Sequence, residues 1–126
     1  MEKRLREINR FMILFDLALG SGALLAPDET LAVLGHRRPS PDARELFRRQ
    51  APVWLTFAAA HLVADRRGAA RDWWALAWLR GTEIATDALW ASRSPAVTGR
   101  GKLGLWGAGA ANLAMALGFG RLAGES

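Results

Sequence analysis

The run from Leu103 to Gly120, LGLWGAGAANLAMALGFG, constrains the fold more than any other part of the chain. It carries no charged residue over a length close to the roughly 20 apolar residues that cross a bilayer core of about 30 Å as a helix. The run is apolar on every side, so it lacks the polar face that a surface helix of a soluble bundle presents. This segment therefore predicts a transmembrane helix.

Three more apolar runs precede it. The first, Phe11 to Ala26, reaches spanning length when it is extended back to Ile8. The second, Ala51 to Ala64, reaches that length only by taking in Leu46 to Gln50, whose arginines can extend toward the interface. The third, Trp73 to Ala91, contains three charged residues, which are costly in lipid unless they face a protein interior.

Two residue patterns favour a membrane protein. Tryptophans lie near the ends of the runs, as an interfacial belt requires, at Trp54, Trp73, Trp74, Trp90 and Trp106. Small residues at near-helical spacing allow close helix approach in the fourth run, at Gly104, Gly107, Ala108, Ala111 and Ala114. We therefore predict an all-α fold, a transmembrane four-helix bundle forming a single domain over residues 1–126. The alternative is a soluble, oligomeric helical bundle.

The composition excludes several classes of site and partner. The chain has no cysteine and only two histidines, which rules out disulfides, thiolate metal sites, cysteine nucleophiles and His-rich metal sites. The net charge is +5 and the sequence pI is about 11.2. The arginines are nevertheless dispersed over the loops, alternate with acidic residues and accompany no nucleic-acid module. Anionic lipid headgroups explain them more simply, so membrane lipid is a predicted partner and nucleic acid is not.

Shorter helices and loops connect the runs. Pro27, followed by two acidic residues, predicts the start of a short helix that Gly35 ends. Residues 36–41 read as a loop, and Ser40 is a candidate N-cap for a helix that begins at Pro41. The first run leads directly into this Pro-capped helix without a clear cleavage site, so no cleavable signal peptide is expected. Arg outnumbers Lys fifteen to two, which is our only ground for expecting a high-GC bacterial source. Together with the four predicted spans, this source predicts a multi-pass protein of the inner (cytoplasmic) membrane.

This layout resembles the small four-span proteins of the DoxX-like kind. The resemblance rests on the first span, the segment LAPDETLAVLG at residues 25–35, an Arg-led second span and a polar third span. It covers the whole chain in outline. It implies a four-span fold with an interfacial helix after the first span and no particular chemistry, so the candidate residues below are chosen on physical grounds alone.

Each run carries polar residues that lipid would disfavour. Asp16 lies in the first run, Asn112 in the fourth, and His61 and Asp65 lie four residues apart in the second. In the third run, three charged residues fall at i, i+3 and i+7 and so share one helix face, which two tryptophans extend: Arg80, Glu83, Asp87, Trp73 and Trp90. In a packed bundle these faces would converge on one internal cavity, and ionisable residues inside a membrane bundle are a functional hypothesis by default.

The charges of this set suggest acid–base chemistry. Four carboxyl groups face one arginine and one histidine, so at least one carboxyl should hold a proton. A membrane-embedded isomerase, cyclase or epoxide-opening enzyme acting on a lipophilic substrate could use Asp65, Glu83, Asp87 and His61 as its catalytic residues. The alternative is that these residues only stabilise the fold. In that case Arg80 pairs with the two acids of its own run, Asp65 faces the headgroups and Asp16 bonds across helices.

A binding role fits the same residues. The ligand-binding candidates are Asp16, Trp54, Trp73, Trp78, Arg80, Trp90 and Asn112, with belt and core packing as the alternative for the tryptophans. No metal is predicted, because the Glu-x-x-His pattern of metal-binding bundles is absent and Arg80 opposes a cation. No cofactor is predicted either. The expected role is binding a small lipophilic or amphipathic molecule. The enzyme above, a homo-oligomer, and an accessory subunit packed through the fourth run are the open alternatives.

Overall fold

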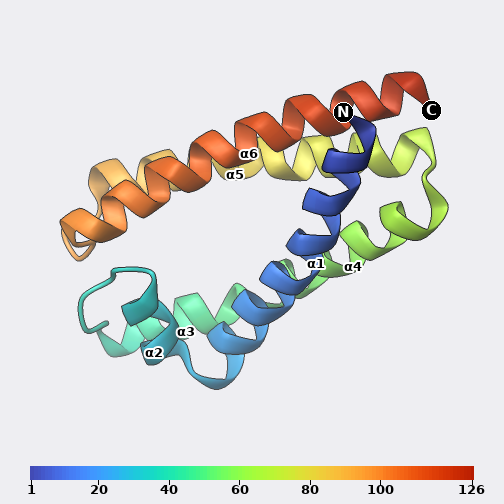
Figure 1. Ribbon diagram of the computed structural model, residues 1–126. Helices are drawn as coiled ribbons and strands as arrows, with labels where there is room; N and C mark the ends of the chain where they lie inside the picture. The colour runs from blue at the N-terminus through green and yellow to red at the C-terminus, as the bar shows by residue number, and fades with distance from the viewer.

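The protein is all-helical, and the computed structural model describes residues 1–126 (Figure 1). The six helices are α1 (Glu2–Leu25), α2 (Pro27–Val33), α3 (Pro41–Arg49), α4 (Ala51–Arg67), α5 (Ala70–Arg93) and α6 (Gly99–Glu125). An isolated antiparallel bridge between His36 and Val97 is the only extended pairing. The predicted all-α class is confirmed.

The four longer helices form two antiparallel pairs. α5 and α6 make a hairpin, and α1 runs alongside α4 (Figure 1). The two pairs meet near the chain termini and diverge toward the other end, where α2 and α3 lie. The main core fills the convergent end and includes Trp73, Leu76 and Phe119, which are fully buried. A smaller core around Leu31 and Phe47 holds α2 and α3 against α1 and α4.

The short helices begin where the sequence predicts. Pro27 occupies the first turn of α2, and the side chain of Ser40 accepts a hydrogen bond from the Ala43 amide (3.2 Å) at the start of α3. The second run does not extend back as one helix, because the chain turns at Gln50, whose amide bonds the Phe47 carbonyl (3.0 Å). Pro52 has no amide hydrogen to donate to the carbonyl four residues earlier, so the helical hydrogen-bond pattern is interrupted at this point.

The divergent end is closed by a backbone contact between the turn that follows α2 and the segment that leads into α6. The Thr98 amide and hydroxyl both donate to the Gly35 carbonyl at 2.8 Å, and the Arg37 amide donates to the Ala96 carbonyl at 2.8 Å. Gly35 has a φ of 80°, and a Cβ atom there would lie 2.5 Å from the Gly101 Cα. Glycine is therefore required at this contact by both conformation and space.

Replacing Gly35 by alanine should weaken this closure. The substitution adds strain at a positive φ and a clash with backbone, so we expect a loss of more than about 1 kcal/mol in unfolding free energy. Thermal unfolding of the purified protein measures the effect. Gly81→Ala is the control, because nothing lies within 4 Å of its Cβ position. An equal or smaller loss for Gly35→Ala than for the control would contradict the assignment.

An ion pair outside the long helices connects α2 to α3. The Arg44 guanidinium donates to both oxygens of Asp28, at 2.6 and 2.8 Å. This hydrogen-bonded pairing lowers the pKa of Asp28 below its ordinary value of 3.8. Because the folded-state pKa is the lower one, the pair stabilises the fold fully above the ordinary value, and that contribution is lost as pH falls through the depressed pKa.

This linkage predicts how an Arg44→Gln variant responds to acid. The wild-type protein should lose the stability advantage that it holds over the variant as pH falls from about 5 to about 2, because protonation of Asp28 removes the pair in the wild type alone. Thermal midpoints across that range measure the difference. Arg66→Gln, which removes an arginine without an ion pair, should keep a constant offset. A constant offset for Arg44→Gln as well would contradict the prediction.

Two helices, α1 and α6, are long and apolar enough to cross a membrane by length and composition. Most of each apolar window lies at the protein surface, with 28% of its residues buried in α1 and 22% in α6. Large apolar side chains of α1, α5 and α6 are highly exposed, among them Leu25, Trp78 and Leu103 at 75% or more. Large exposed apolar patches mark surfaces that bind another protein or a membrane, so these exposed side chains favour an apolar neighbour.

Candidate functional site

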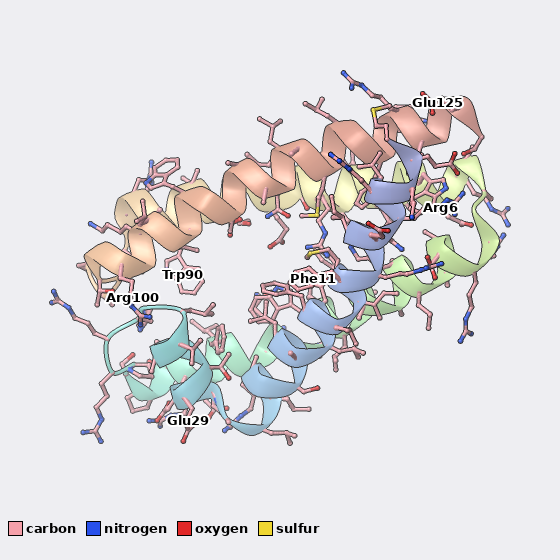
Figure 2. All side chains as sticks on the ribbon, viewed as in Figure 1. Arg6, Phe11, Glu29, Trp90, Arg100 and Glu125 are labelled. Atoms are coloured by element: carbon pink, nitrogen blue, oxygen red, sulfur yellow. The ribbon has the colours of Figure 1, made fainter.

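A cavity of about 550 Å³ lies between the two helix pairs. Its walls come from α1, α5 and α6, with Trp54 from α4 and the turn after α2. Figure 2 shows Phe11 of α1 and Trp90 of α5 projecting into the space between the pairs. The lining includes exposed residues of α1 and α6, among them Phe11, Phe15 and Ala108, so the cavity opens between these two helices.

A chain of four buried polar side chains lies at the convergent end of this cavity. Arg80 Nε donates to His61 Nε2 at 3.0 Å, and an arginine cannot accept, so His61 Nε2 carries no proton. The proton then sits on Nδ1, which donates to Asn9 Oδ1 at 2.6 Å. Asn9 Nδ2 closes the arrangement by donating to the His61 carbonyl at 3.1 Å. His61 is therefore held as one neutral tautomer with both ring nitrogens occupied.

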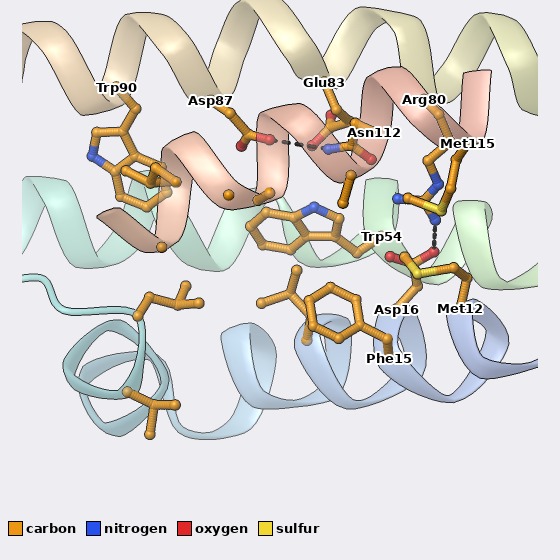
Figure 3. A pocket seen from close by; sticks show the side chains of 18 of the residues that line it. Met12, Phe15, Asp16, Trp54, Arg80, Glu83, Asp87, Trp90, Asn112 and Met115 are labelled. Carbon is orange, nitrogen blue, oxygen red and sulfur yellow. Dashed lines mark hydrogen bonds and ion pairs between the residues drawn. The ribbon is translucent and has the colours of Figure 1, made fainter. Parts of the chain in front are cut away.

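The other end of this chain is an ion pair. Arg80 Nη2 binds Asp16 Oδ2, and both side chains are almost fully buried, with 4% and 1% exposure. The Arg80 guanidinium also lies over the Phe57 ring, 5.4 Å from its centroid. The second carboxylate oxygen, Asp16 Oδ1, is buried and has no hydrogen-bond partner. Asp16 is one of the residues that line the cavity (Figure 3), although its Oδ1 atom itself is buried.

Two further carboxyl groups project from α5 along the same wall (Figure 3). Glu83 and Asp87 lie one and two turns beyond Arg80, and both are half-buried. Asn112 Nδ2 of α6 donates to Asp87 Oδ2 at 3.0 Å, and the Glu83 side chain makes no hydrogen bond or ion pair. Neither carboxyl has a cationic partner within 4 Å. The α5 wall therefore carries two unpaired acidic groups.

A second cavity of about 450 Å³ continues from the first. It lies against α3 and α4, and the two cavities share four wall residues, Trp54, Glu83, Asp87 and Trp90. The acidic groups of α5 and two indole rings therefore stand where the cavities meet. These four side chains therefore border both cavities.

Most of the residues singled out from the sequence gather here. Seven of them line the first cavity: Asp16, Trp54, Arg80, Glu83, Asp87, Trp90 and Asn112. The shared face of Arg80, Glu83 and Asp87 is confirmed. Asn112 joins them because its side chain bonds Asp87 of the neighbouring helix. His61 is buried behind Arg80 and does not line the cavity.

Three candidates lie elsewhere. Asp65 does not join the cluster, because Arg10 of α1 binds it near the surface at 2.9 Å. Trp73 is a core residue stacked on Phe119, with ring centroids 5.7 Å apart. Trp78 points outward and is 75% exposed. An acid–base centre of His61 and Asp65 is therefore not assembled, and the acidic groups that face the cavity are those of α1 and α5.

The expected ion-pair partners of Arg80 are wrong. Arg80 does not pair with Glu83 and Asp87 of its own helix, because Asp16 reaches it from α1. The expected bond of Asp16 across helices is confirmed by the same contact. Sequence reasoning missed Asn9, although it lies seven residues before Asp16 on the same helix face, and this spacing is the signal that could have identified it.

No group of three or more metal-ligating side chains gathers anywhere in the chain. The two pairs with a four-residue spacing do not come together, because Asp65 binds Arg10 near the surface, whereas Glu83 and Asp87 line the cavity. The chain matches no protein-family model, no curated protein and no solved structure.

Proposed function

We propose that the protein binds a small amphipathic molecule in the cavity between its two helix pairs. The observation that carries this proposal is a cavity of about 550 Å³ with one charged wall, in which the buried Asp16 Oδ1 lacks a partner. Ligand sites are typically apolar clefts of about 300–1,000 Å³ with a few convergent polar groups. An apolar body would contact Phe15 and the tryptophans while a polar end meets the acidic wall.

We further propose that α1, α4, α5 and α6 cross the cytoplasmic membrane as a four-helix bundle. The exposed apolar side chains of α1, α5 and α6 support this arrangement, since lipid would cover them. The arginine-rich turns at 36–41 and 66–71 would then contact headgroups, and α2 would lie at the interface. The resemblance to DoxX-like proteins fits this topology and stays a prediction from sequence.

In that setting the cavity would open to the bilayer. Its mouth lies between α1 and α6, the two helices with the most apolar exposed surfaces, and includes Phe11 and Phe15. The rings of these phenylalanines lie 6.2 Å apart on the α1 side. A lipophilic molecule could enter sideways from the hydrocarbon without crossing water.

Two measurements test the proposal. After an alkaline carbonate wash, the protein should stay in the membrane pellet until detergent is added, and release by carbonate alone would overturn the membrane assignment. Native mass spectrometry in mild detergent should then show a retained small molecule. A clean unliganded mass in several mild detergents would count against ligand binding whatever the fractionation shows.

A further inference from the structure

The cavity wall carries more acidic than basic groups. Asp16, Glu83 and Asp87 line it against two arginines, Arg80 and Arg100. Arg80 is already occupied by Asp16 and His61. Arg100 is exposed at the divergent end, where it donates to the Ala32 carbonyl at 3.3 Å, so water screens its charge. The half-buried carboxyls of α5 are left without a cation of the protein's own.

Asp16 adds a second, independent requirement. Its carboxylate is 1% exposed, one oxygen binds Arg80, and the other has no partner. A buried charged oxygen without a hydrogen bond is costly, and a donor bound in the adjoining cavity would remove that cost. Asp16, whose charge Arg80 compensates, thus calls for a hydrogen-bond donor, and the α5 carboxyls call for a positive charge, so a group that supplies both fits this wall.

Aromatic rings surround the same groups. Trp54 and Trp90 share the cavity wall with Glu83 and Asp87, and Phe15 lines it from α1 (Figure 3). The face of an indole ring attracts cations, most strongly when they are desolvated. The ring faces also supply flat apolar surface for the rest of the molecule. Carboxyl groups and indoles at one place favour an organic cation over an anion or a neutral polar group.

We infer that the ligand of this cavity is a lipophilic amine, whose ammonium group binds the acidic wall formed by Asp16, Glu83 and Asp87. Its apolar body lies against Phe15, Trp54 and Trp90. This inference rests on the proposed function, because it names the chemical class of the molecule that the cavity binds.

Three probes that share one apolar body test the charge preference directly. We would measure binding of 2-naphthylmethylammonium, 2-naphthylmethanol and 2-naphthoate to the detergent-purified protein by equilibrium dialysis. The ammonium should bind about tenfold or more tightly than the alcohol, since one close charge pair is worth at least that factor, and the carboxylate should bind most weakly.

Isosteric variants assign the preference to the wall. The double variant Glu83→Gln, Asp87→Asn removes both charges of α5 with little change in shape, so it should bind the ammonium and the alcohol about equally. Asp65→Asn is the matched control, because it removes a carboxylate that binds Arg10 outside the cavity, and it should keep the wild-type preference.

The outcomes separate the two proposals. If the alcohol binds the wild type as tightly as the ammonium, the cavity binds apolar molecules but the inference of a cationic ligand is wrong. If the double variant keeps the preference, the acidic wall of α5 is not its source and the inference is likewise overturned. If none of the three probes binds, the proposed function fails together with it.

Discussion

Replacing Arg80 by methionine is expected to lower the unfolding free energy by about 3–5 kcal/mol, because the change leaves the Asp16 carboxylate buried without its counterion. Methionine keeps much of the apolar stem, so the loss reports the missing charge rather than a large void. The His61 ring nitrogen that now accepts from Arg80 would also lose its donor. Denaturant or thermal unfolding in a fixed detergent measures the difference.

The chain offers a matched control for this prediction. Arg10→Met also removes an arginine that connects α1 to another helix, through Asp65 at 2.9 Å. The Arg10 side chain is 66% exposed, so its pair should contribute only about 0–1 kcal/mol. Equal losses for Arg80→Met and Arg10→Met would show that burial does not determine the effect.

A second variant separates lost charge from lost packing. In the Arg80→Met background, Asp16→Asn removes the uncompensated charge and should restore most of the stability, since neutral replacement of a buried pair is often tolerated. Failure of the double variant to recover would mean that the Arg80 side chain stabilises the protein by packing, for instance over the Phe57 ring.

The local part of the site was predictable from the sequence. Arg80, Glu83 and Asp87 share a face because their spacing follows the helical repeat, and that repeat is fixed within a single helix. The same holds for the start of α2 at Pro27 and the cap at Ser40, where chemistry acts over a few residues. The all-α class followed from such local patterns as well.

The partners across helices were not predictable in the same way. Asp65 lies one turn from His61 and shares its helix face, yet α1 crosses α4 so that Arg10 binds Asp65 while Asn9 binds His61. The pairing of Arg80 with Asp16 depends likewise on how α1 packs against α5. Periodicity fixes the face that a side chain occupies, but the crossing of the helices determines what that face meets.

Trp73 and Trp78 illustrate the same limit for aromatic residues. Both lie on α5, five residues apart, and the sequence predicts that each indole ring packs against apolar groups of the core, the lipid interface or a ligand. One fills the core against Phe119 and the other is 75% exposed on the outer surface. A tryptophan is equally suited to core, lipid interface and ligand cavity, so its residue type alone does not distinguish them.

Filling the cavity with a large side chain is expected to weaken ligand binding strongly. Ala108 of α6 lines it one turn before Asn112, the residue that bonds Asp87. A tryptophan at position 108 would project beside that acidic group and occupy space that the ligand needs. Overlap with a bound molecule costs about 1–3 kcal/mol, so Ala108→Trp should weaken binding of the naphthyl ammonium probe about tenfold or more.

Ala110→Trp controls for the size of the new side chain, since Ala110 is exposed on the same helix and does not line either cavity. It should bind the probe as the wild type does. Both variants should unfold near the wild-type temperature, because each alanine lies at an exposed position. If Ala108→Trp keeps full affinity, the molecule binds outside the cavity. If Ala110→Trp loses affinity equally, the site lies on the outer face of α6, and the acidic wall of α5 has no part in binding.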